Sequence, residues 1–596
     1  MGNPTTSAYR SLLSLASMLL LAAGCPPAVG DDTGDTGDTD TSSTTETTGP
    51  TETGTTGSNG DCAPLVQADV DQDVTLPAGC YIAENWLSIQ SALTLEAGVT
   101  ISFSEFSGLA ISGSGMIVAS GSASNPVVLN AIEPAAAGWL GVSLSAVSST
   151  QNSLEYTEIS GVNANEAAVS MFGGGKISIT NSKIVDNQST AIEISPDSQI
   201  ELGKTTIQGN AEIGWVGLGS LATIAADNEF TGNSENVLLA DGSSIDTDMT
   251  WRPLGVPVRL RDTYVEINAD LVLEAGFELQ IPQDGILDVT SEGTFNAVGT
   301  ADSPVIVHGA KDELGYWVGI SFSSKSSSNV LDYVLLENGG GDNWNGNSDS
   351  LSMIWMTEMA KLKVTHSTFR RSAWYVLAAN QGADISGFAG NEIRDNTRAL
   401  HLSGDAAGQV DSDNVFADNS DENVVRVGFS EALITNAGEW SALTVPYFVS
   451  VELEVENDLV IAAGAEIRVA QDVQITVYPE GSLDASGSAD SSVRIVGDET
   501  ISGYWAGINY ASISSKNRLT YTTLSDAGSY EWYGGGDAKA SIYVGGYYGD
   551  ALVTLQNSTI ANADGYGLIV DEDSSIDCSV TFDGVEKPSV LGPGSC

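Results

Sequence analysis

The sequence predicts an all-β solenoid, because it repeats at two distances and its segments alternate apolar and polar residues. The longer repeat occurs three times in the 596 residues. In the first copy the segments LTLEAG, GSASNP, GWLGVS and SLEYTE follow one another, and related segments follow in the same order in the other two copies. The tryptophans of the third segment, Trp139, Trp317 and Trp505, are 178 and 188 residues apart. Self-similarity at fixed spacing indicates a repeat architecture.

A shorter period of 23 residues lies inside the long repeats. A β-branched or aromatic residue is followed three positions later by asparagine, and the flanking residues alternate as in strands. One period is therefore a solenoid rung of about three strands, and the folded part would hold roughly twenty rungs stacked about 4.8 Å apart. We expect the asparagines to form a ladder of amide hydrogen bonds at the turns. The pairs in the first copy are Ile184/Asn187, Ile207/Asn210 and Phe230/Asn233.

These motifs resemble those of right-handed parallel β-helix proteins of the pectin-lyase-like type. The shared features are the GxWxGI segment, the LxYxxI segment after it and rungs of the form N-S-x-I-x-x-N. The resemblance covers residues 66–585 and implies a right-handed parallel β-helix. It implies no single activity, because the family includes polysaccharide lyases, glycoside hydrolases, adhesins and inert surface proteins. The Gly-His-Gly and Arg-Ile-Lys motifs of polygalacturonase-like hydrolases are absent.

The N-terminus has the features of an export signal. Arg10 precedes an apolar run that is too short to span a bilayer as a permanent helix. The run ends in Leu-Ala-Ala-Gly-Cys25, which resembles the lipobox of bacterial lipoproteins. By that resemblance residues 1–24 are removed as a signal peptide and Cys25 receives acyl chains. Pro26 follows the cysteine, which in enteric lipoproteins implies the outer membrane, facing either the outside or the periplasm. The alternative is an ordinary secreted protein.

The rest of the chain divides into a linker and three modules. Residues 25–61 contain the lipidation cysteine and an acidic Thr/Gly/Asp tract that lacks apolar residues, so we expect this linker to be disordered. Trp251 and Trp440 mark the starts of the second and third modules. The expected β-helix modules are 62–250, 251–439 and 440–596, the last of which includes a C-terminal cap.

The charge of the chain restricts its partners. It contains 78 acidic and 22 basic residues, which gives a formal net charge of −56. Such a surface repels phosphate backbones, so nucleic acid is excluded as a partner. The expected partners are a membrane, through the lipid anchor, and a polysaccharide or another cell surface. The sequence requires no cofactor, and calcium is the metal that so acidic a composition would suit.

Four cysteines follow Cys25 and fit an exported protein. Cys62 and Cys80 lie 18 positions apart near the start of the folded part, and Cys578 and Cys596 lie 18 positions apart at its end. Four cysteines allow three connectivities. We expect the two local disulfides, because each would staple one end of the solenoid.

A cluster of charged residues in the second module is a candidate catalytic site. Arg371, Asp395 and Asp418 each lie two residues after a stacked apolar residue, so successive rungs would place them in one column about 5 Å apart. Arg394 directly precedes Asp395. Asp395 and Asp418 could bind calcium or act as an acid and a nucleophile, and arginine would hold the carboxylate of an acidic sugar. The alternative is a ladder of ion pairs on a solvated face.

Two matching insertions are candidate ligand-binding loops. They occupy residues 338–350 and 526–538, and their glycine and polar content predicts that they protrude. Exposed aromatic planes in them would suit the apolar faces of sugar rings. The alternative is that these aromatic side chains lie back on the solenoid. The residues concerned are Trp344, Tyr530, Trp532 and Tyr533.

The sequence therefore favours a lipid-anchored surface protein that displays a β-helix and binds glycans or other surfaces without catalysis. The rival hypothesis is a carbohydrate-active enzyme, either a calcium-dependent polysaccharide lyase or a glycoside hydrolase, with its site in the second module. A third is a passive spacer. Catalysis would require Arg371, Asp395 and Asp418 to face one open groove, whereas an ion-pair ladder would leave them paired.

Overall fold

The computed structural model describes residues 62–65, 69–132, 138–163, 165–344, 350–532, 538–545, 549–592 and 596. The expected signal peptide, the lipidation site Cys25 and the linker lie outside these residues. The part of the chain from Asp61 to Cys596 forms one compact unit.

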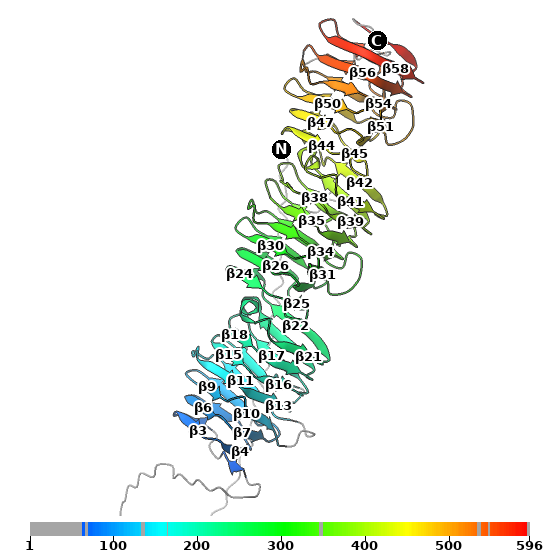
Figure 1. The fold of residues 1–596 in the computed structure, drawn as a ribbon. Helices are drawn as coiled ribbons and strands as arrows, with labels where there is room; N and C mark the ends of the chain where they lie inside the picture. The colour runs from blue at the N-terminus through cyan, green and yellow to red at the C-terminus, as the bar shows by residue number, and fades with distance from the viewer. Residues whose placement is uncertain are drawn as a thin grey trace, which may run out of the picture. The chain divides into compact units, whose positions relative to one another are not determined.

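This unit is an all-β parallel β-helix of about twenty turns, which confirms the predicted fold class. Its strands follow one another around the solenoid, so that a strand pairs with one that comes two or three strands later in the chain. The pairs between the named strands are parallel throughout, as in β10 (Val127–Ala131) with β13 (Thr157–Ser160). Strands stack from β3 (Val74–Leu76) to β58 (Ser575–Asp583) (Figure 1).

The sheets run across the positions of the expected module boundaries. One sheet of 15 strands extends from β2 (Asp69–Val70) to β41 (Val415–Ala417), and another of 18 strands extends from β23 (Ser244–Ile245) to β58. Trp251 and Trp440, at those boundaries, are each 1% exposed. The three repeats therefore share continuous sheets and one core.

Inward-facing apolar residues stack in register to form that core. The 23-residue period places Ile184, Ile207 and Phe230 opposite one another in three successive strands. Successive side chains of a strand point to opposite faces, so the central residue of each short strand is buried and its neighbours face outward. Phe369 repeats the arrangement in the second repeat, with Ile393 one turn later and Phe416 two turns later. The strands are β16 (Lys183–Val185), β19 (Thr206–Gln208), β21 (Glu229–Thr231), β37 (Thr368–Arg370), β39 (Glu392–Arg394) and β41.

An amide ladder closes the turns after these strands, as the repeated asparagines predicted. Asn187 Nδ2 donates to Asn210 Oδ1 at 2.8 Å, and Asn210 Nδ2 donates to Asn233 Oδ1 at 3.0 Å. The same oxygens accept the backbone N–H of the preceding asparagine, at 3.2 and 3.0 Å. Asn396 and Asn419 repeat the bond in the second repeat, at 3.1 Å. The ladder thus pairs polar groups that would otherwise be buried without partners.

The three recurring tryptophans have a structural role. Trp139, Trp317 and Trp505 are completely buried. Each indole N–H donates to a backbone carbonyl about one turn further along the chain, which ties the loop before one strand to the end of another. The acceptors are the carbonyls of Ser160, Glu337 and Ser525, at 2.9, 2.7 and 2.7 Å.

Disulfides lie at both ends of the unit. Cys62 is joined to Cys80 and Cys578 to Cys596, which confirms the predicted local pairing. In the chain-entropy model a loop of this size contributes about 3 kcal/mol. The helices in the described part of the chain are short, with η1 at Leu218–Thr223 and α1 at Gly404–Ala407. None of them is long and apolar enough to cross a membrane.

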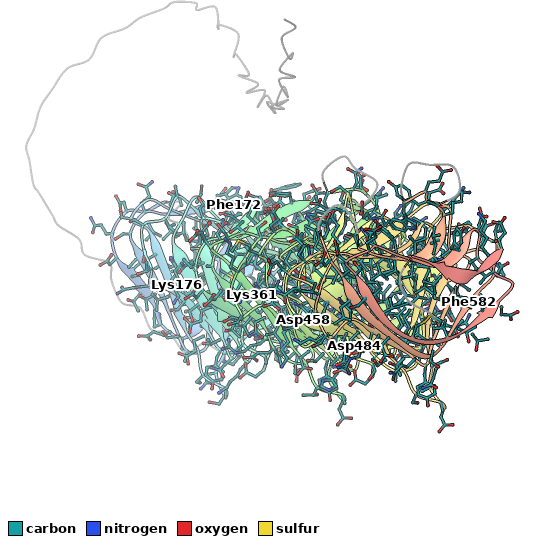
Figure 2. All side chains as sticks on the ribbon, turned by 90° about the horizontal axis from the view of Figure 1, so that it is seen from above. Phe172, Lys176, Lys361, Asp458, Asp484 and Phe582 are labelled. Atoms are coloured by element: carbon teal, nitrogen blue, oxygen red, sulfur yellow. A yellow bond between two sulfur atoms is a disulfide. The ribbon has the colours of Figure 1, made fainter. Side chains whose placement is uncertain are left out.

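Polar side chains cover the outside of the sheets (Figure 2). Lys176 pairs with Glu201 at 3.0 Å, and Lys361 pairs with Asp384 at 3.6 Å, in both cases across neighbouring turns. Exposed pairs of this kind contribute little individually. Together they offset part of the repulsion in a chain with a net charge of −56.

The amide ladder predicts a specific sensitivity to mutation. Asn210→Ala should lower the free energy of unfolding by about 2 kcal/mol, because it leaves buried donors and acceptors of two neighbouring turns without partners. Gln208→Ala, at an exposed position in the same turn, is the control and should change it by less than about 0.5 kcal/mol. Denaturant titration would measure both, and equal effects would contradict a stabilising role for the ladder.

Candidate ligand-binding groove

The described residues form an open groove of about 640 Å³ on the outer face of the second repeat. Its floor comes from β31 (Val305–Gly309), β34 (Val334–Glu337) and β37, where His308, Glu337 and Arg370 lie directly opposite one another. These side chains face outward because the residue before each of them is buried in the core. The lining residues are His308, Asp312, Leu314, Glu337, Asn338, Arg370, Arg371 and Asp395.

The turns that border this groove belong to a series in which one residue has a left-handed backbone. At this corner of the solenoid that residue lies two positions after the inward-facing residue, and φ ranges from 45° to 73° over eleven described turns. A different corner has the same backbone conformation at positions that include Tyr156, Lys204, Tyr333, His366 and Tyr521. Glycine, asparagine and aspartate tolerate this conformation best. Ten of the eleven positions hold one of these three residues. They are Gly161, Asp186, Gly209, Gly232, Asn338, Asp395, Asp418, Asp526, Asn562 and Gly584.

This series explains two of the predicted site residues without catalysis. Asp395 and Asp418 have φ angles of 57° and 55°. Aspartate is favoured there by the backbone alone, as glycine is at the corresponding positions of the first repeat. The column of carboxylates that the sequence indicated is therefore a consequence of turn geometry.

Arg371 is the exception in the series, with φ of 59°. A long side chain in this conformation costs on the order of 1–3 kcal/mol and persists only where its surroundings hold it. The Arg371 side chain reaches the loop between β31 and β32 (Gly319–Phe322), where Nε lies 2.9 Å from Asp312 Oδ1 and Nη2 donates to the Asp312 carbonyl at 3.1 Å. An observed outlier that contacts a groove is a reason to look for function there.

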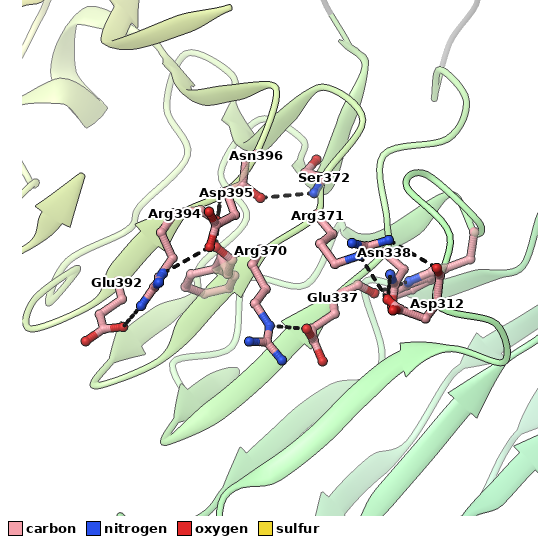
Figure 3. A network of polar contacts seen from close by, with 12 residues as sticks. Asp312, Glu337, Asn338, Arg370, Arg371, Ser372, Glu392, Arg394, Asp395 and Asn396 are labelled. Atoms are coloured by element: carbon pink, nitrogen blue, oxygen red, sulfur yellow. Dashed lines mark hydrogen bonds and ion pairs between the residues drawn. The ribbon is translucent and has the colours of Figure 1, made fainter. Parts of the chain in front are cut away.

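Each arginine at the groove faces a carboxylate (Figure 3). Arg370 Nε donates to Glu337, and this hydrogen bond raises the pKa of Arg370 above its ordinary value. The Glu337 side chain is 13% exposed, so this pair is the most shielded of the group. The pairs are Arg370–Glu337, Arg371–Asp312 at 2.9 Å and Arg394–Asp395 at 3.1 Å.

The predicted catalytic residues are only partly brought together. Arg371 and Asp395 line the groove, and Arg394 borders it through its ion pair with Asp395. Asp418 is not among the lining residues. The two carboxylates proposed as a calcium or acid/nucleophile pair thus do not both line this groove.

Sequence reasoning missed most of the groove residues, and three of them show why. Glu337 lies between His308 and Arg370 in register, so an alignment of successive strands would have found it. Asn338 belongs to the left-handed series. Asp312 carried no such signal, because the equivalent loop of the third repeat holds Thr500 at its position and the charged side chain is therefore not repeated.

The tryptophans of the two insertions lie back on the solenoid. Trp344 Nε1 donates to the Ser352 carbonyl at 2.9 Å, and Trp532 Nε1 donates to the Ala540 carbonyl at 3.0 Å, in each case eight residues further on. Tyr530 is 50% exposed, and its ring lies 5.1 Å from that of Trp532. Tyr533 lies outside the described residues. Of the predicted binding aromatics in the described loops, Tyr530 is thus the one that presents a large surface to solvent.

The described residues contain no group of three or more histidine, cysteine, aspartate or glutamate side chains that could hold a metal ion. No family model matches the chain, and a search of curated proteins also gives no match. The function therefore has to be argued from the geometry of the site.

The left-handed series can be tested at Asp418. If backbone conformation selects the residue, Asp418→Gly and Asp418→Asn should leave the free energy of unfolding within about 0.5 kcal/mol of the wild type. Asp418→Val should lower it by about 2 kcal/mol, because a β-branched residue is a true outlier at positive φ. Denaturant titration of the three variants would decide. Equal losses for glycine, asparagine and valine would show that the carboxylate itself is needed.

Proposed function

We propose that this protein is an exported lipoprotein that displays its β-helix on the cell envelope and binds a glycan in the groove of the second repeat without catalysis. The observation that carries this proposal is the paired character of the groove, in which each arginine faces a carboxylate: Arg370 and Arg371 pair with a neighbouring turn and loop, and Arg394 pairs with the adjacent Asp395. Guanidinium groups supply planar donors and carboxylates supply acceptors side by side. A chain of sugar hydroxyls can use both.

The membrane and localisation parts of the proposal rest on the sequence. Cys25 with its preceding small residues supports lipid attachment, and Pro26 supports sorting to the outer membrane. The acidic linker would hold the β-helix away from the lipid surface. Polysaccharide or another cell surface is the proposed partner.

A polysaccharide lyase or glycoside hydrolase is the second candidate. Arg371 and Asp395 both line the groove, which favours it. Against it, Asp395 already accepts a hydrogen bond from Arg394, and Asp418 is not a lining residue. We therefore place binding ahead of catalysis.

The proposed function is tested by binding and turnover on a panel of acidic and neutral polysaccharides. Affinity electrophoresis should show retention, with no new reducing ends and no unsaturated uronate absorbance, with or without calcium. Arg370→Gln should weaken binding at least tenfold, because it leaves the shielded Glu337 without its partner at the groove floor. Arg468→Gln is the matched control, since Arg468 is similarly exposed and pairs with Glu466 outside this groove. Product that disappears in Asp395→Ala would establish the enzyme instead.

Lipid attachment is tested separately at Cys25. Cys25→Ser should move the protein from the detergent phase to the aqueous phase in a detergent-partition experiment, because the acyl chains would no longer be attached. A variant that stays with the detergent would contradict anchoring at this residue.

A further inference from the structure

We propose that Asp312 acts as a built-in competitor at the groove, and that a carboxylate or sulfate group on the glycan replaces it. The Asp312 latch, meaning the contacts of Asp312 with Arg371 and Asn338, would occupy these two side chains when no ligand is bound and give way when an acidic group binds. This inference rests on the proposed function and adds to it the chemical class of the ligand.

The latch joins a loop to two successive turns. Asp312 Oδ1 lies 2.9 Å from Arg371 Nε and accepts a hydrogen bond from Asn338 Nδ2 at 3.2 Å. Arg371 Nη2 also donates to the Asp312 backbone carbonyl, at 3.1 Å. Figure 3 shows both side chains directed at Asp312. Asn338 and Arg371 are neighbours in the left-handed series, so they present their side chains from adjacent turns at the groove.

Arg371 is the residue that turn geometry does not explain. The other ten positions of the series are satisfied by glycine, asparagine or aspartate, and such a residue here would relieve the backbone. Arginine at this position instead supplies a planar cationic fork at the groove, which matches a carboxylate or a sulfate. The strained position is thus used to present an anion-binding group.

A ligand could replace Asp312 as the partner of the Arg371 guanidinium group. The Asp312 side chain is 84% exposed, whereas that of Glu337, on the neighbouring arginine, is 13% exposed. Exposed ion pairs contribute little to stability. Arg371 Nε is buried, and although it lies close to Asp312 Oδ1, it does not make a directed hydrogen bond to it. A ligand oxygen placed in line with this N–H would accept the hydrogen bond that Asp312 does not accept.

The charge of the whole chain narrows the ligand class further. A net charge of −56 opposes the approach of a dense polyanion. An acidic group that is isolated on a largely neutral glycan avoids most of this repulsion and still reaches Arg371. We therefore expect lightly substituted acidic polysaccharides to bind better than fully charged ones.

The test uses dextran in three forms: unmodified, lightly carboxymethylated and lightly sulfated. Asp312→Asn should bind the carboxymethylated form, the sulfated form or both at least fivefold more tightly than the wild type, with no change for unmodified dextran. The two substituted forms show whether carboxylate or sulfate is preferred. Glu313→Gln is the matched control, because it removes one negative charge from an exposed residue of the same loop that does not contact Arg371. It should change affinity less than twofold.

Two further results bear on the latch itself. Adding Arg371→Lys to Asp312→Asn should abolish the gain, because lysine keeps the charge but loses the fork. In the wild type, bound acidic dextran should speed hydrogen exchange of the amides of residues 311–316, while β50 (Ser482–Ser486) should not change.

Several outcomes would overturn the proposal. Equal gains for Asp312→Asn and Glu313→Gln would mean a general charge effect. Equal affinity of the wild type and Asp312→Asn for acidic dextran would show that Asp312 does not compete, while the proposed glycan binding would survive. Absence of binding to every dextran and to every polysaccharide of the earlier panel, by wild type and variant alike, would overturn both proposals.

Discussion

Every turn of this solenoid has to follow the path of the turn before it, because its strands pair in parallel with their neighbours in the stack. A residue in one turn therefore meets the equivalent residue of the next turn at about 5 Å. Apolar residues meet apolar residues inside, and asparagine meets asparagine at the turn, where Asn187, Asn210 and Asn233 are linked by their amides. The rest of the structure depends on this stacking of like on like.

The same constraint leaves few positions for function. Inward positions are taken by the core, and at the corner beside the groove the residue that turns the chain is held with φ near 60°, where ten of the eleven described positions are glycine, asparagine or aspartate. Outward positions of the strands and the longer loops remain. The groove is built from these: His308, Glu337 and Arg370 on three adjacent strands, with Asp312 in a loop. Arg371 is the exception within that series, and it lines this groove.

The features that repeat could be predicted from the sequence, and those that do not repeat could not. The stacking of Phe369, the asparagine ladder and the local disulfides follow from spacing and were confirmed. The sequence also placed Arg371 and Asp395 in one cluster. The alignment was interpreted as a candidate catalytic site. For Asp395, however, the left-handed backbone is enough to explain why aspartate is present. The loop that carries Asp312 has a counterpart of the same length in the third repeat, but that loop holds Thr500 at the equivalent position, so the repeat gave no sign of a partner for Arg371.

The most direct measurement of the central claim is a crystal structure of the protein with a lightly acidic oligosaccharide bound. We expect the ligand in the groove of the second repeat, with its acidic group on Arg371 and Asn338 and the Asp312 carboxylate displaced from both. A ligand bound elsewhere, for example over Tyr530, or bound in the groove with the contacts of Asp312 intact, would contradict this account of the site.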